Sequence, residues 1–166
     1  MFQKALVIGS PGAGKSTFAR KLRDAAGLPL YHLDMLWHKP DKTTITPEEF
    51  DQKLAAILAK DRWVIDGNYL RTLETRIKPC DAVFLLDPPV DACLAAAEAR
   101  IGTRRDDLPW VEESLDDEFR QYILDFPRTQ LPAVRTLLEK YQKEKTVVIF
   151  RSWQESDNWL ASLHER

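Results

Sequence analysis

Eight residues near the start of the chain combine glycine, lysine and serine at a spacing suited to binding phosphate groups. The segment GSPGAGKS, from Gly9 to Ser16, matches the pattern G-x-x-x-x-G-K-[ST]. In this pattern, backbone N–H groups and a helix N-terminus surround a polyphosphate, while the lysine reaches its β- and γ-phosphates. We therefore predict that the segment binds ATP and that the Ser16 hydroxyl binds Mg²⁺. The predicted nucleotide contacts are Gly9, Ser10, Pro11, Gly12, Ala13, Gly14, Lys15, Ser16 and Thr17.

The segments on either side of this loop are those that the pattern requires. The apolar residues 5–8 predict a strand. Residues 17–26 predict a helix, because Phe18, Leu22 and Ala25 fall on one face and Gly27 is placed to end it. A glycine turn in an unrelated α/β protein is the alternative, and the strand and helix disfavour it.

Length and composition predict one domain over residues 1–166. The net charge of −2 is too small to indicate binding to nucleic acid or to a membrane. Because the chain begins almost directly on its first strand and has no apolar run of transmembrane length, we expect a cytoplasmic protein. Cys80 and Cys93 have no metal-site spacing and are expected to be reduced thiols.

Strand and helix patterns alternate along the chain, which predicts an α/β fold with a parallel sheet. The segment 102–127 has a dense charge cluster followed by apolar residues among acidic ones. We predict a lid that closes over the phosphates there, and a solvated loop with an amphipathic helix is the alternative. Further strands are expected at 30–33, 63–65, 82–86 and 146–150, and further helices at 47–60 and 90–101.

Two aspartates follow predicted strands, at the sheet edge where α/β proteins bind ligands. Asp66 follows the strand 63–65 and is the predicted second ligand of Mg²⁺. Asp34 follows the strand 30–33 and is a candidate to bind a substrate hydroxyl and assist its deprotonation. Each aspartate could instead cap a turn.

Arg71 and Arg76 are candidates for substrate binding, because a guanidinium group can hold a phosphate or another anion with two hydrogen bonds. Pairing with a surface carboxylate is the alternative for each arginine.

Several motifs together resemble the adenylate-kinase-related P-loop kinases. They are the phosphate loop, the strand ending in Asp-Gly, and the helix that ends in Arg100-Ile-Gly-Thr-Arg104. Within this group, the chain is similar to the small bacterial topology modulation proteins, through YHLDMLW from Tyr31, DRWVIDGNY from Asp61 and FPRT from Phe126. The resemblance implies a three-layer P-loop NTPase fold with a parallel sheet in the order 2-3-1-4-5 and a helical lid.

The resemblance also implies roles for three arginines. Arg100 would pack near the adenine, while Arg104 would begin the lid and touch the transferring phosphates. Arg128, within FPRT, would return from the lid. With Lys15 and Asp34, Arg104 and Arg128 complete the expected catalytic set, since guanidinium groups stabilise the charge on a transferring phosphoryl group.

The function predicted from these features is ATP-dependent phosphoryl transfer to a nucleotide, a nucleoside or another small molecule. A hydroxyl acceptor is slightly favoured, because Asp34 is present while the Phe-Pro-Arg continuation of the adenylate kinase Asp-Gly segment is missing. The alternative is a regulatory or DNA-associated ATP-binding protein that phosphorylates no acceptor. A GTPase is disfavoured, because the sequence lacks an Asn-Lys-x-Asp motif.

Overall fold

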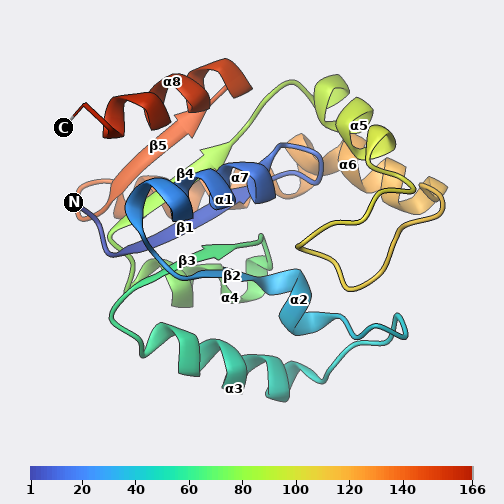
Figure 1. Ribbon diagram of the computed structural model, residues 1–166, viewed down its shortest axis with the longest axis horizontal. Coiled ribbons are helices and arrows are strands. Elements are labelled where there is room, and N and C mark those ends of the chain that lie inside the picture. Colours follow the sequence, from blue (N-terminus) through green and yellow to red (C-terminus); the bar gives the residue numbers. More distant parts are fainter. Residues whose placement is uncertain (166) are drawn as a thin grey trace.

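The computed structural model describes residues 1–165 and contains a five-stranded parallel sheet between helices (Figure 1). The strands are β1 (Lys4–Gly9), β2 (Leu30–His32), β3 (Trp63–Asp66), β4 (Ala82–Leu86) and β5 (Thr146–Phe150). The helices are α1 (Lys15–Ala26), α2 (Leu33–Trp37), α3 (Pro47–Leu58), α4 (Leu70–Ile77), α5 (Val90–Ala99), α6 (Asp117–Thr129), α7 (Leu131–Tyr141) and α8 (Trp153–Leu163). The order β2-β3-β1-β4-β5 confirms the predicted α/β fold and sheet order.

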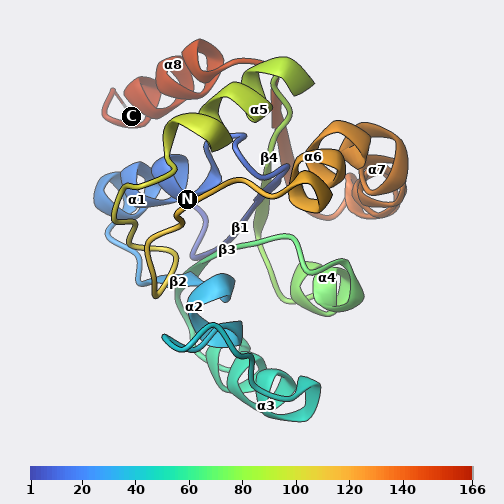
Figure 2. The same ribbon diagram turned by 90° about the vertical axis from the view of Figure 1, so that its right-hand side faces the viewer.

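Both faces of the sheet are covered, which explains why the interior positions of its central strands are apolar. On β1, Ala5 and Val7 belong to the core under α1 and α8, whereas Leu6 and Ile8 belong to the core under α3, α4 and α7. Figure 2 shows α1 and α8 on one side of the sheet and α4 and α7 on the other. All strands run parallel, so their carboxyl ends share one edge.

Local sequence signals explain where the helices begin and end. The Thr46 side chain accepts a hydrogen bond from the backbone N–H of Glu49, and Pro47 occupies the first turn of α3. Gly27 ends α1 in the left-handed conformation, and its N–H donates to the carbonyl of Arg23.

The structure corrects the prediction of a strand over 30–33. β2 ends at His32, which lies opposite Asp66, the last residue of β3. With no partner strand beyond that point, the chain turns into α2, and Asp34 lies in the first turn of this helix. α2, α4, α7 and α8 were not predicted, and the predicted helices 47–60 and 90–101 end two residues early.

Two further features concern the whole described chain. Within residues 1–165, no helix is long and apolar enough to cross a membrane. Cys80 and Cys93 are both buried, and neither forms a disulfide.

Candidate active site

The phosphate loop joins β1 to α1 and is closely packed from two sides. At Gly12, where φ is +78°, a Cβ atom would lie 2.0 Å from the carbonyl oxygen of Cys93. At Gly14, where φ is +91°, it would lie 2.7 Å from Nε1 of Trp153, which donates to the Ala13 carbonyl at 2.9 Å. Only glycine therefore fits these two positions, and α5 and α8 fix the shape of the loop.

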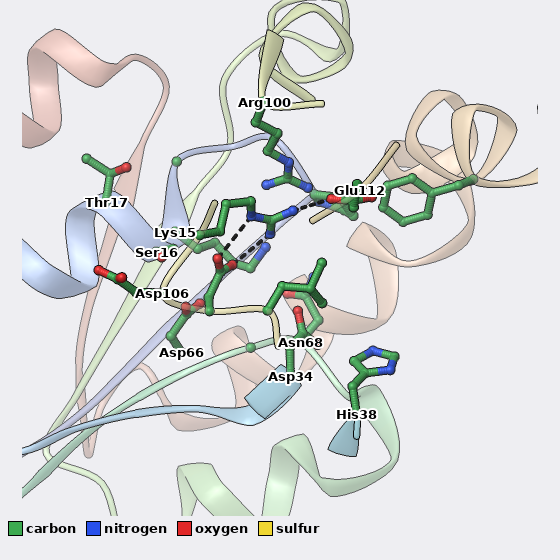
Figure 3. A pocket seen from close by; sticks show the side chains of 18 of the residues that line it. Lys15, Ser16, Thr17, Asp34, His38, Asp66, Asn68, Arg100, Asp106 and Glu112 are labelled. Carbon is green, nitrogen blue, oxygen red and sulfur yellow. Dashed lines mark hydrogen bonds and ion pairs between the residues drawn. The ribbon is translucent and has the colours of Figure 1, made fainter. Parts of the chain in front are cut away.

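A cavity of about 830 Å³ opens above the phosphate loop at the carboxyl edge of the sheet. It brings together Lys15, Ser16, Asp34, Asp66 and Arg100, which come from separate parts of the chain (Figure 3). Its side-chain cations are Lys15, Arg20, Arg100, Arg104 and Arg105. Its carboxylates are Asp34, Asp66, Asp106, Asp107, Glu112 and Asp116. The cavity thus collects many charged groups at the edge where α/β proteins bind ligands.

A smaller cavity of about 330 Å³ adjoins the outer side of the loop. Gly12, Gly14, Ala96, Arg100 and Trp153 contribute to its lining. Because Arg100 lines both cavities, the two spaces meet beside the phosphate loop.

Lys15 lies inside the phosphate loop, and its Nζ donates to the Ser10 carbonyl at 3.2 Å. Burial lowers the pKa of Lys15, while the nearby carboxylates of Asp66 and Asp34 act in the opposite direction. A polyphosphate would supply further negative charge and favour the ammonium form.

Asp66 presents one carboxylate oxygen without a partner. Its Oδ2 lies 2.7 Å from Nδ1 of His32, whereas its Oδ1 is buried and makes no hydrogen bond. In the same cavity, the Ser16 hydroxyl accepts a hydrogen bond from Arg20 at 2.7 Å and keeps a second lone pair. A carboxylate, a hydroxyl and substrate phosphates are the donors that Mg²⁺ prefers, so these residues fit the predicted metal.

Asp34 is held by a phenol group. Its Oδ1 accepts a hydrogen bond of 2.5 Å from the hydroxyl of Tyr69. Burial raises the pKa of Tyr69, and the charge of Asp34 raises it further, so the phenol stays protonated and donates. Asp34 lines the cavity together with Lys15.

The turn between β3 and α4 connects Asp34 to the phosphate loop. Its Asn68 side chain accepts from the backbone N–H of Gly9 at 2.9 Å and donates to the Gly9 carbonyl. The next residue, Tyr69, has φ of 37°, a left-handed conformation that is strained for an aromatic residue. This short turn therefore contacts the phosphate loop through Asn68 and Asp34 through Tyr69.

Arg76 supports this turn from below and does not line the cavity. The side chain is fully buried and donates to the carbonyls of Gly67, Asn68 and Tyr69. Burial lowers the pKa of Arg76 to about 9, which leaves the guanidinium charged at neutral pH. In the structure, the predicted substrate-binding arginine occupies a supporting position.

Arg71 and Arg128 also lie outside the cavity lining. Arg71 is exposed on α4 and pairs with Asp51 of α3 through two hydrogen bonds of 2.9 and 3.1 Å. Arg128 lies in the last turn of α6, is 77% exposed, and pairs with Asp125 at 3.1 Å. The amphipathic pattern of residues 117–129 forms a helix, which turns Arg128 toward solvent.

The segment between α5 and α6 runs along the cavity. Arg105 pairs with Asp107 at 2.8 Å and with Glu112, and the carbonyl of Glu112 accepts from Gly102 N–H at 2.7 Å. Although burial opposes its ionisation, hydrogen bonds from Arg105 hold the pKa of Asp107 below its ordinary value. Arg104 is exposed and lines the cavity one residue before this cluster.

Several residues of the site were not predicted from the sequence. Asn68, Tyr69, Arg105 and Trp153 act through contacts with distant segments. Only Asn68 and Tyr69 carried a signal, since they directly follow the Asp-Gly pair at the end of a buried strand.

Comparisons with known proteins bear on the fold. No protein-family model and no curated protein matches the chain. It is similar to the structure of shikimate kinase from Acinetobacter baumannii in complex with shikimate, with 16% identity, a TM-score of 0.66, and coverage of 99% of this chain and 92% of that chain. It is also similar to gluconokinase from Sinorhizobium meliloti 1021, with 19% identity, a TM-score of 0.54, and coverage of 98% and 94%. The chain has the α/β fold of the P-loop kinases.

Proposed function

We propose that this protein transfers the γ-phosphoryl group of ATP to a hydroxyl group of a small molecule. The observation that carries the proposal is one cavity that holds Asp34 opposite the phosphate loop with Lys15 and Ser16. Phosphoryl transfer to a hydroxyl group requires a loop that binds the phosphates and a carboxylate that accepts the hydroxyl proton, and this cavity contains both. The fold shared with shikimate kinase and gluconokinase supports the same reaction class.

The nucleotide would lie along the phosphate loop. The loop amides and Lys15 bind the phosphates, and the smaller cavity beside Arg100 and Trp153 receives the base. Ser16 and Asp66 would hold Mg²⁺, which neutralises charge on the β- and γ-phosphates when bound. The unpartnered Oδ1 of Asp66 supports this assignment.

The acceptor would be deprotonated by Asp34. Its hydroxyl oxygen forms a bond to the γ-phosphorus while the bond from that phosphorus to the β–γ bridging oxygen breaks and ADP leaves. The hydroxyl proton passes to one oxygen of the Asp34 carboxylate. The other carboxylate oxygen, Oδ1, accepts the hydrogen bond from Tyr69. Lys15, Arg100 and Arg104 stabilise the charge that spreads over the transferring group.

The segment 102–127 is proposed as the lid of this site. Its first part, up to the N-terminus of α6, has no regular secondary structure and supplies Arg104 and Trp110 to the cavity. Closure of this segment over the phosphates would exclude water, so that transfer goes to the acceptor and not to hydrolysis.

A screen with γ-labelled ATP tests the proposal. Wild-type protein and Lys15→Ala are incubated with Mg·ATP and panels of nucleosides, nucleotides and small alcohols. We expect labelled product from at least one hydroxyl compound, and a loss of at least 100-fold in Lys15→Ala. Transfer only to phosphate groups, or equal transfer by Lys15→Ala, would contradict the proposed reaction.

A further inference from the structure

We infer that the acceptor is an uncharged molecule with at least two hydroxyl groups and a flat apolar face, such as a nucleoside or a sugar. This inference rests on the proposed function and names the substrate class of its site. It depends on the charges of the cavity, on the positions of the arginines, and on the side chains around His38.

The charge of the cavity leaves little attraction for a second anion. Its lining contains five side-chain cations and six carboxylates, and the nucleotide phosphates would already occupy the cations near the loop. An anionic acceptor would then face Asp34 without a free partner, and like charges at short range are costly in a partly buried site.

Two of the five cavity cations, Arg20 and Arg105, are engaged by the protein, and the proposed function assigns the other three to the phosphates of ATP. Arg20 donates to Ser16 and Thr17 on the helix that follows the loop. Arg105 is neutralised by two carboxylates. Arg100 and Arg104 lie near the start of the segment that follows α5, and Arg100 also lines the smaller cavity.

The two arginines that the sequence suggested for substrate binding are also unavailable to an anionic acceptor. Arg71 pairs with Asp51 on the surface, and Arg76 is buried against backbone carbonyls. In the described part of the chain, neither lines the cavity. A kinase for a phosphate or carboxylate acceptor would be expected to place such a group in the site.

The cavity lining also includes aromatic side chains and a histidine with unused hydrogen-bonding capacity. His38 lies one helical turn after Asp34, and its Nδ1 is buried with no partner. Trp110 meets the His38 ring edge-on at 5.0 Å. Phe119 and Tyr122, which stack on each other at 6.3 Å, line the same cavity. His38 could bind a second hydroxyl of an acceptor whose flat face packs on these rings.

Calorimetry on matched pairs of compounds tests this inference separately from turnover. Protein saturated with Mg·AMP-PNP is titrated with adenosine, guanosine, cytidine and uridine, each against its 5′-monophosphate, and with glucose against gluconate. We expect at least one neutral compound to bind at least tenfold more tightly than its anionic partner. Tighter binding of the anionic partners, or no binding by any neutral compound, would overturn the inference. The proposed function fails on a different result, which is the absence of labelled product from any hydroxyl compound in the transfer screen.

A pair of histidine variants tests the subsite. His38→Ala should weaken binding of the neutral compound about tenfold and change the Kd of Mg·AMP-PNP less than twofold. His164→Ala is the matched control, because His164 is exposed at the end of α8. If His38→Ala binds the neutral compound as well as His164→Ala does, His38 does not contact the acceptor and the subsite is wrong.

Discussion

Removing one hydroxyl group, in Tyr69→Phe, tests whether the turn after β3 positions the acceptor base. The Tyr69 ring stacks on Phe50 at 5.2 Å and meets Trp37 edge-on at 6.4 Å, and phenylalanine preserves both contacts. The substitution deletes only the 2.5 Å hydrogen bond to Asp34. Its effect therefore reports on the orientation of Asp34 and not on packing.

The structure sets the size of the expected effect. A hydrogen bond to a charged group contributes about 1.5–3 kcal/mol, and water from the open cavity can replace part of it. We expect the free energy of unfolding to fall by about 1 kcal/mol. If a similar energy orients Asp34 in the transition state, kcat falls about fivefold, while the Kd of Mg·ATP changes less than twofold.

The assay compares kcat, KM and the Kd of Mg·ATP in Tyr69→Phe and Tyr141→Phe. Tyr141 makes the same type of bond, to Glu74 at 2.8 Å, on helices α7 and α4 outside the cavity lining. We expect a normal kcat for Tyr141→Phe. Equal kcat values for the two variants would refute the positioning role of Tyr69, and a large loss of ATP affinity in Tyr69→Phe would indicate a different role.

Three further predictions concern residues around the site. Arg104→Ala should lose most turnover and melt near the wild-type temperature, whereas Arg128→Ala should keep wild-type turnover and melting temperature. The reason is that Arg104 lines the cavity and Arg128 does not, and steady-state kinetics and thermal melts check this. Arg76→Met should lower the free energy of unfolding by about 3 kcal/mol or more in urea titrations, since buried carbonyls lose their donor. Burial raises the pKa of Cys80 to about 12, so native protein should not react with iodoacetamide at this residue at pH 8, as peptide mass spectrometry will show.

The sequence predicted the strand and helix around the glycine loop, because a contiguous local pattern encodes them. In the structure, Lys15 and Ser16 of this segment line the cavity together with Asp66. The strand pattern also identified all five strands. The central strands β1, β3 and β4 were the clearest, since residues buried on both faces form short apolar runs.

The acceptor side could not be predicted to the same degree, because it depends on tertiary contacts. Nothing in the spacing of Arg76 distinguishes an arginine that faces a cavity from one that is buried against carbonyls. The same holds for Asn68, whose partner Gly9 is 59 residues away in the chain. The short strand β2 was predicted one residue too long, because its end depends on where β3 ends.

Single-turnover transfer from labelled ATP by wild-type protein and Asp34→Asn tests the central claim most directly. Asparagine keeps the size of the side chain and deletes the charge that accepts the proton of the acceptor hydroxyl. With the hydroxyl compound that the screen identifies, we predict that the transfer rate of Asp34→Asn falls at least 100-fold, while the Kd of Mg·ATP changes less than twofold. Undiminished transfer by Asp34→Asn, to a hydroxyl compound or to a nucleoside monophosphate, would contradict the account.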